Sequence, residues 1–219
     1  MRVLLAGQKA FGAAVFTALR KLKGVDIAAV SAPFGDKPDR LAAQADLHRV
    51  LLIPGGTLNA ATMPEGIDLI VTAHSHDFIG EKTRLRATYG GIGYHPSLLP
   101  LHRGRDAIRW ALLMGDKVTG GTVYRLSNKM DGGNVLAQKH VFIPHGATAR
   151  DLWRDTLFPL GVEMLCQTVE LFRDKGFVNG TPQDERFATW EPSIDRPPAF
   201  RPDLIMLPSA PGEEILSAW

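Results

Sequence analysis

This chain of 219 residues lacks several features that would place it in a specialised structural class. It has one cysteine, Cys166, so no disulfide can form within it, which fits a reducing compartment. No apolar run approaches the roughly 20 residues that a membrane-spanning helix needs. The apolar run in Arg2–Ala6 is too short for a signal segment and predicts a strand. We therefore expect a cytoplasmic protein that makes no membrane contact.

The chain also lacks a strong charge of either sign. It carries 25 Lys+Arg against 23 Asp+Glu, a formal net charge of +2, and its basic residues are scattered. Without a basic run to follow a phosphate backbone, we expect no nucleic-acid partner. The charge supports only a weak preference for anionic small molecules. An apolar content of 45% is ordinary for a globular domain.

A dinucleotide-binding fingerprint is missing too. Gly7–Gly12 follows the first strand and opens a helix, but it lacks the G-x-G-x-x-G spacing, and no acidic residue ends the second strand at Ser31. A simple strand-to-helix turn is the favoured interpretation. An anion at the helix N-terminus stays open.

What is present is an alternation of short apolar runs and amphipathic segments. In the first half it predicts a parallel sheet with crossover helices, and in the second half two antiparallel strands follow. The fold class is thus α/β, Rossmann-like, with a mostly parallel mixed sheet and helices on both faces. The expected strands are Arg2–Ala6, Asp26–Ser31, Val50–Ile53, Ile67–Thr72, Gly90–Tyr94, Thr122–Leu126 and Val135–Phe142.

The last third predicts a helix and then a tail. Thr148 resembles an N-cap, and the helix that follows is expected to break at Pro159. From Phe177 the chain is proline-rich and too short for a second domain. We expect a catalytic domain over residues 1–180 and a C-terminal extension over 181–219. The extension could pack across the domain or join a homodimer.

Two groups of reactive side chains have ordinary explanations. His74 and His76 could suggest a metal site, together with His95 and His102, but no carboxylate follows at a metal-motif spacing. We expect them to line a cleft or make loop hydrogen bonds, with no metal bound. Cys166 occupies an apolar helical position, where core packing is the favoured role.

The most informative stretch is residues 91–104, Gly-Ile-Gly-Tyr-His-Pro-Ser-Leu-Leu-Pro-Leu-His-Arg-Gly. It delivers His95 from the end of a strand into a loop that its prolines keep irregular. Asp131 stands at a second loop, before two glycines that indicate a tight turn. A carboxylate that holds and polarises an imidazole is a common device for proton transfer near neutral pH.

The stretch from His95 to Gly104, with Met130-Asp-Gly-Gly133 and Leu157-Phe-Pro-Leu-Gly161, resembles the formyltransferases that use 10-formyltetrahydrofolate. The likeness covers about residues 1–180. It is closest to the amino-terminal hydrolase domain of 10-formyltetrahydrofolate dehydrogenase. The resemblance implies an enzyme of one-carbon metabolism whose formyl donor is the folate, with no metal.

The resemblance also implies roles for individual residues. His95 and Asp131 would be catalytic, and the attacking nucleophile would add to the formyl carbon on N10 of the folate. The expected folate-binding positions are Phe78, Ile79, Ser97, Leu98, Leu99, Ser127, Met130, Gly132 and Gly133.

One position departs from the family pattern. Most of these transferases have an asparagine two residues before the histidine, and this chain has Gly93. Loss of one oxyanion donor typically costs about 100- to 1,000-fold in rate. A protonated His95, a water or a group on the acceptor would have to take over that role.

Three functions remain open at this point. The first is formyl transfer to a small amine acceptor. The second is hydrolysis of 10-formyltetrahydrofolate to formate and tetrahydrofolate. The third is a non-catalytic protein that binds folate or a partner. A tRNA acceptor is not expected, because the residues after Phe177 are too few for the second domain that such an enzyme carries.

Overall fold

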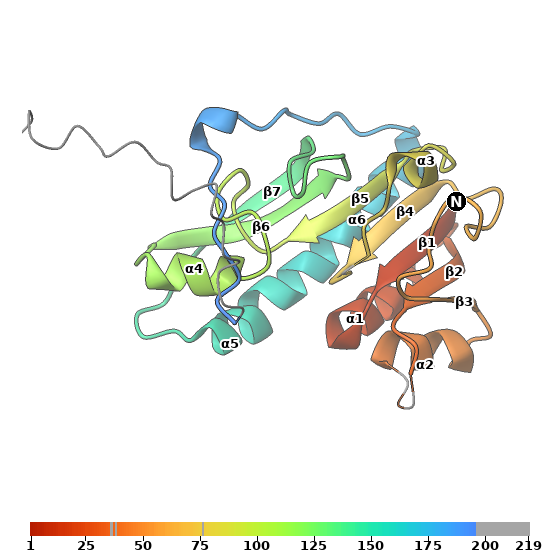
Figure 1. Cartoon of the computed structure of the whole chain (residues 1–219), viewed down its shortest axis with the longest axis horizontal. Coiled ribbons are helices and arrows are strands. Elements are labelled where there is room, and N and C mark those ends of the chain that lie inside the picture. Colours follow the sequence, from red (N-terminus) through yellow and green to blue (C-terminus); the bar gives the residue numbers. More distant parts are fainter. Residues whose placement is uncertain (36, 38, 76, 196–219) are drawn as a thin grey trace, which may run out of the picture.

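The computed structural model describes residues 1–35, 37, 39–75 and 77–195. A seven-stranded sheet runs through the molecule in the order β3-β2-β1-β4-β5-β6-β7 (Figure 1). The first five strands are parallel, and β6 runs antiparallel to both β5 and β7. The expected mixed sheet is confirmed. The strands are β1 Arg2–Gly7, β2 Asp26–Ala32, β3 Leu51–Pro54, β4 Leu69–Ala73, β5 Gly91–His95, β6 Val118–Arg125 and β7 Val135–Phe142.

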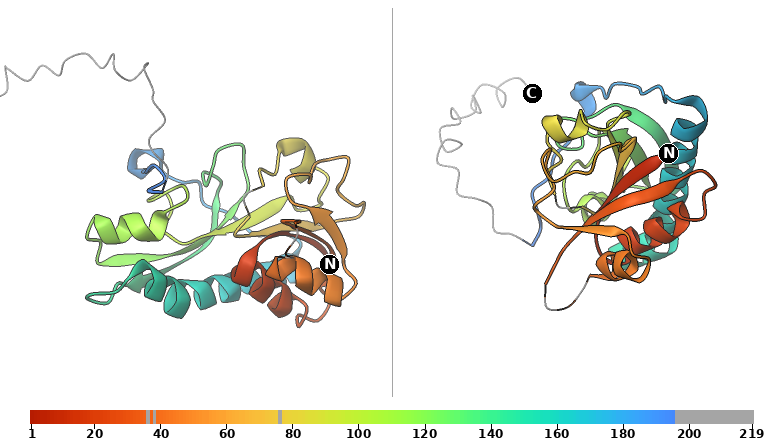
Figure 2. Two further views of the ribbon diagram at one scale, coloured as in Figure 1. Left: turned by 60° about the horizontal axis from the view of Figure 1, so that its bottom comes forward. Right: turned by 90° about the vertical axis from the view of Figure 1, so that its right-hand side faces the viewer.

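Helices lie on both faces of this sheet, but unequally. The left-hand view of Figure 2 shows the longer helices on one side and the short α3 and α4 on the other. Long loops cover much of the second face. The helices are α1 Lys9–Leu19, α2 Arg40–Leu47, α3 Glu81–Arg84, α4 Ala107–Leu113, α5 Ala149–Leu152 and α6 Phe158–Lys175.

Alternate residues of the central strands feed two separate apolar clusters. Val3 and Leu5 of β1 face the cluster formed with α1, α2 and α6, while Leu4 and Ala6 face the other. This is the two-residue period of a strand that is buried on both faces. Because both faces are buried, these strands appear in the sequence as the near-continuous apolar runs that predicted a parallel sheet.

The carboxyl ends of the parallel strands meet at one edge of the sheet. The chain reverses its direction of growth between β1 and β4, since β2 and β3 extend the sheet on one side and β4 and β5 on the other. Ligands of open α/β sheets bind at such a reversal. His95 is the last residue of β5, at the same edge.

The helical segment near the C-terminus differs from its prediction in one respect. Thr148 caps α5 as expected, since its side chain accepts a hydrogen bond from the Asp151 amide. The irregularity then lies before Pro159, in a π-helical turn at Trp153–Leu157, and α6 runs unbroken to Lys175. Pro159 stands in the first turn of α6, where a missing N–H costs no helical hydrogen bond.

Within the described part of the chain, no helix is long and apolar enough to cross a membrane. After α6, the chain returns across the molecule to the loops that follow β5 and β6 (Figure 1). Thr181 bridges to Val135 at the start of β7, and Trp190 bridges to Arg103. Residues 196–219 of the expected extension, with His76, lie outside the described residues.

Candidate active site

His95 is buried at the carboxyl end of β5, and its ring is fixed by the loop that follows. Its Nε2 lies 2.6 Å from the carbonyl oxygen of His102. A carbonyl only accepts, so Nε2 carries the proton. Nδ1 is then the nitrogen that can exchange a proton with a ligand, and it lies 3.7 Å from Oδ2 of Asp131. The structure thus brings together the two residues that the sequence paired.

Asp131 is held by two donors. Its Oδ1 accepts a hydrogen bond of 2.6 Å from the hydroxyl of Tyr124, and its Oδ2 accepts one of 2.9 Å from the amide of Gly104. Burial, and then the Asp131 charge, raise the pKa of Tyr124 well above its usual value. Tyr124 therefore stays a hydroxyl donor at neutral pH, and the carboxylate is aimed at His95 by partners on β6 and on the β5 loop.

The loop after His95 is held largely by its own polar groups. Ser97 is fully buried, and its hydroxyl donates to the carbonyl of Leu101 at 2.6 Å. The amide of Leu99 donates to Oγ1 of Thr122 on β6 at 3.2 Å, and the Leu99–Pro100 peptide bond is cis. Leu98 is half-buried. The expected folate contacts at Ser97 and Leu99 thus fall on buried residues that shape this loop.

Gly93 does not leave an empty space in the sheet. A Cβ atom there would lie 2.6 Å from Oγ1 of Thr72 on β4. It would also lie 3.3 Å from the side chains of Tyr124 and Leu126. The position of the family's asparagine is therefore surrounded by the neighbouring strands, and the Thr72 hydroxyl is the polar group nearest to it.

The residues expected to receive the pterin divide between two loops. In the first, Phe78 is exposed, while Ile79 is buried in the second apolar cluster. In the second, the hydroxyl of Ser127 donates to the carbonyl of Lys129 at 2.9 Å, and Met130 is exposed.

The turn after Asp131 requires its glycines. A Cβ on Gly133 would lie 1.7 Å from the carbonyl oxygen of Arg125, and one on Gly132 would lie 2.7 Å from the side chain of Lys129. Asp131 itself has a φ of +49°, which a non-glycine residue rarely adopts. These features present the Asp131 carboxylate beside β5.

Arg84 connects the two loops through hydrogen bonds. Its side chain is buried and donates to the carbonyl of Ile79 and, at 2.6 Å, to Oδ1 of Asn128. This arginine was not singled out in the sequence, because its partner lies 44 residues away along the chain.

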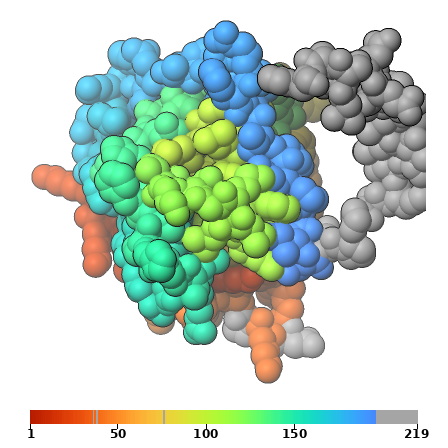
Figure 3. Space-filling model, turned by 90° about the vertical axis from the view of Figure 1, so that its left-hand side faces the viewer, coloured from red at the N-terminus to blue at the C-terminus, as the bar shows by residue number. Residues whose placement is uncertain are grey.

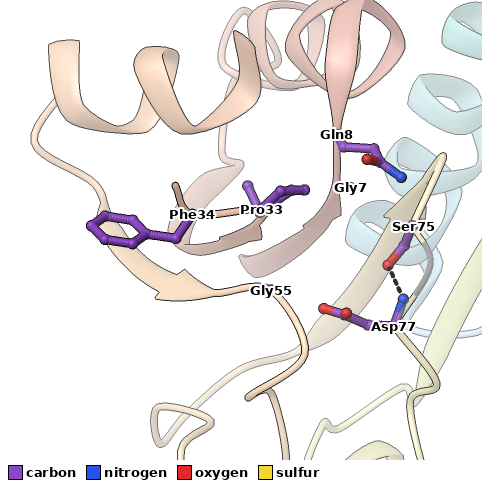
Figure 4. A pocket seen from close by; sticks show the side chains of 8 residues that line it. Gly7, Gln8, Pro33, Phe34, Gly55, Ser75 and Asp77 are labelled. Carbon is purple, nitrogen blue, oxygen red and sulfur yellow. Dashed lines mark hydrogen bonds between the residues drawn. The ribbon is translucent and has the colours of Figure 1, made fainter. Parts of the chain in front are cut away.

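A pocket of about 270 Å³ opens beside the reversal point, where β1, β2, β3 and β4 end. Figure 4 shows Gln8, Ser75 and Asp77 on one side of it and Pro33 and Phe34 on the other. The Asp77 carboxylate accepts hydrogen bonds from the Ser31 hydroxyl and the Gly56 amide. The pocket shares the sheet edge with His95, because β4 pairs directly with β5.

The N-terminus of α1, beside this pocket, is bound by the carboxylate of Asp39. Both carboxylate oxygens of Asp39 accept from the Lys9 amide, at 2.8 and 2.9 Å, and one also accepts from the Leu41 amide. Gly7 permits close packing of β1 on β4, since a Cβ there would lie 2.3 Å from the carbonyl of Ala73. Both observations favour the simple turn over an anion site.

The other candidates are the histidines of a possible metal site and Cys166. Among the described residues, no group of three or more His, Cys, Asp or Glu is placed to hold a metal ion. His74 is exposed with a φ of +58°, and His76 lies outside the described residues. Burial, and then the nearby Glu170, raise the pKa of Cys166 to about 11, which disfavours its reactive thiolate form.

Tyr124 is the main site residue that sequence reasoning missed. It faces Gly93 across the β5–β6 pair. A tyrosine opposite a strand glycine would have been the signal, but it can be read only once the register of the two strands is known.

Comparison with known proteins identifies the family of this chain. A family model described as Formyl transferase matches residues 1–169, and the chain belongs to this family. It is 34% identical over 202 residues to the mitochondrial 10-formyltetrahydrofolate dehydrogenase of Mus musculus. That match covers 87% of this chain but only 22% of the relative.

Solved structures share the fold. A phosphoribosylglycinamide formyltransferase from Bacillus halodurans superposes with a TM-score of 0.67 at 20% identity, covering 81% of this chain and 97% of that one. An N-formyltransferase from Helicobacter canadensis, in complex with folinic acid and dTDP-3-aminofucose, gives 0.70 at 18% identity. It covers 86% of this chain and 70% of its own. At these identities the likeness concerns the fold alone.

Proposed function

We propose that this protein transfers a formyl group from 10-formyltetrahydrofolate to a small amine acceptor. The observation that carries the proposal is the His95–Asp131 pair, with Nδ1 of His95 directed toward Oδ2 of Asp131 at 3.7 Å. Membership of the formyl transferase family supports the donor. The pterin would lie between the Phe78–Ile79 loop and the 127–133 turn, which Arg84 and Asn128 connect.

The pocket at the reversal point supports an acceptor molecule rather than water alone. Its volume of about 270 Å³ accommodates a small metabolite. Because Asp39 occupies the Lys9 amide at the start of α1 and Asp77 lines the pocket, a neutral or cationic group fits there better than a phosphate.

The chemistry requires only the movement of protons around an acyl transfer. The acceptor nitrogen bonds to the formyl carbon, the bond from that carbon to N10 of the folate breaks, and N10 takes up a proton. The proton that the amine loses passes to Nδ1 of His95, Asp131 stabilises the charged imidazole, and His95 then gives this proton to N10. No oxidant or reductant is needed, and the products are the formamide and tetrahydrofolate.

Hydrolysis is the second candidate, favoured by the 34% identity to a 10-formyltetrahydrofolate dehydrogenase. In that reaction water replaces the amine at the same formyl carbon, and formate is released. Gly93 is compatible with it, since the asparagine of most transferases is absent.

The two reactions separate in one experiment. The purified protein is given 10-formyltetrahydrofolate with and without a panel of amino sugars and other primary amines, and tetrahydrofolate and formate are both measured. Transfer predicts amine-dependent tetrahydrofolate without formate, whereas hydrolysis predicts equal amounts of both without amine.

His95→Ala and Asp131→Ala should abolish either activity. Unchanged turnover in both variants would overturn the site. Folate binding without turnover in the unmodified protein would indicate the non-catalytic alternative.

A further inference from the structure

The segment of residues 181–191 lies against both loops that carry the active-site pair. It lies beyond residues 1–169, to which the family model matches. Figure 3 shows this C-terminal part of the chain, in blue, bordering the yellow-green face formed by the β5 loop and α4. Its backbone pairs with the β5 loop, since Thr189 donates to Pro100 and accepts from Arg103, both at 3.1 Å.

Gln183 joins the Asp131 turn to the β5 loop through one side chain. Its Nε2 donates to the carbonyls of Asp131 and Gly133, each at 2.7 Å. Its Oε1 accepts from the buried guanidinium of Arg103 at 2.7 and 3.2 Å. Arg103 also donates to Glu185, at 3.0 and 3.1 Å.

Glu191 lies beside His102, the residue whose carbonyl contacts His95. The His102 ring lies between two carboxylates, with Nε2 2.8 Å from Asp116 and Nδ1 3.2 Å from Glu191. Glu191 is only 8% exposed, and its two oxygens make no hydrogen bond within the described part of the chain. A buried carboxylate needs a polar or charged partner, and Nδ1 of His102 is the ring atom that the structure places beside it.

Two hydrogen bonds of the His102 backbone connect the 181–191 segment to His95. Its amide donates to Oγ1 of Thr189 at 2.8 Å, and its carbonyl accepts the Nε2 proton of His95. His102 has a φ of +54°, so its backbone conformation is one that neighbouring contacts must maintain. The residue that accepts the His95 proton therefore contacts the 181–191 segment through both its amide and its ring.

We propose that Gln183 and Glu191 are positioning residues of the active site, Gln183 positioning Asp131 and Glu191 positioning His95 through His102. This inference rests on the proposed function for its kinetic test. Together the two residues maintain the 3.7 Å approach of His95 to Asp131. A displacement of about 1 Å at such a site can lower the rate about 100-fold.

Two substitutions test this without changing side-chain size. Gln183→Glu keeps an acceptor for Arg103 but cannot donate to the Asp131 turn. Glu191→Gln keeps the packing but removes the charge beside His102. Arg186→Ala is the control, since its side chain is 82% exposed and its polar contacts are with Asp184 of the same segment.

We expect kcat to fall about 10- to 100-fold in both test variants, with KM for 10-formyltetrahydrofolate changed less than about threefold and the control unaffected. A segment that only covers the domain predicts a lower melting temperature with unchanged kcat per folded molecule. That result, or control-like values throughout, would overturn the proposal.

A second measurement is independent of turnover. In protein labelled with nitrogen-15 histidine, the proton on Nε2 of His95, assigned with His95→Ala, should shift or disappear in Glu191→Gln and persist in Arg186→Ala. If the unmodified protein does not consume 10-formyltetrahydrofolate, the proposed function fails, and this resonance alone decides the inference. An unchanged His95 resonance in Glu191→Gln would then overturn it.

Discussion

At the scale of single residues, the arrangement around Asp131 shows how a strand supports a loop residue. The carboxylate stands in a turn, but one of its oxygens is bound by a hydroxyl that β6 fixes and the other by the Gly104 amide. Each hydrogen bond to a charged group is worth about 1.5–3 kcal/mol. The orientation of Asp131 is thus set by groups that never need to touch the substrate.

Tyr124→Phe tests this support. We expect kcat to fall about 10- to 100-fold, because the variant loses the 2.6 Å hydrogen bond to Asp131 while keeping its ring. The measurement is steady-state kinetics with 10-formyltetrahydrofolate. Tyr89→Phe is a matched control, since the Tyr89 ring stacks on Phe172 under α6. A kcat within twofold of the unmodified protein would contradict the role of Tyr124.

Gly93→Asn should destabilise the protein rather than accelerate its reaction. The new Cβ would lie 2.6 Å from Oγ1 of Thr72, and overpacking of this kind costs about 1–3 kcal/mol. Urea unfolding measures the loss, and Gly93→Ala introduces the same Cβ without the amide. A faster and equally stable Asn variant would show that the strands can accommodate the amide and that an oxyanion donor had been missing.

At the scale of secondary-structure elements, two motifs that looked separate in the sequence form one contact. The hydroxyl of Tyr94 on β5 donates to the carbonyl of Leu157 at 2.8 Å, just before α6 begins. The Tyr94 ring fills the space that a Cβ atom at Gly161 on α6 or at Gly121 on β6 would need. Burial raises the pKa of this tyrosine, so its hydroxyl remains a donor.

Gly161→Ala should therefore reverse the usual effect of alanine in a helix. An unhindered Gly→Ala change inside a helix stabilises it by about 1 kcal/mol. Here the added methyl would lie 2.5 Å from the Tyr94 ring, and we expect a loss of about 1–3 kcal/mol in the free energy of unfolding. Chemical denaturation measures it, and the double variant with Tyr94→Leu should recover part of the loss. A stabilised single variant would show that the ring moves aside freely.

The elements were largely predictable because their burial follows simple periods. The strands of the parallel half, the two antiparallel strands and the cap at Thr148 all follow from local patterns. His95 and Asp131 were found because each follows a strand and stands in a distinctive loop. Tyr124 and Gln183 were not, since their roles depend on strand register and on a contact 52 residues away along the chain.

At the scale of the whole molecule, the proposed site draws on segments from both sides of β5. The loop before α3 comes from the parallel half, the Asp131 turn from the antiparallel half, and the 181–191 segment from beyond α6. The chain spans 22% of the length of the dehydrogenases that it matches, so the activities of those whole proteins do not transfer to it directly. Arg84 connects the 127–133 turn to the loop before α3, and Gln183 connects it to the 181–191 segment.

A folate bound between these segments should stabilise the entire domain. If the pterin lies between the Phe78–Ile79 loop and the 127–133 turn, binding adds contacts that exist only in the folded state. At a concentration of about 100 times Kd, a ligand raises the free energy of unfolding by about 2.7 kcal/mol. For a domain of this size, that shifts Tm by about 5–10 °C. Thermal unfolding with folinic acid measures the shift, and p-aminobenzoylglutamate, which lacks the pterin, serves as the control. An equal shift with both compounds would place the binding energy outside the two loops, and no shift with saturating folinic acid would contradict a folate site.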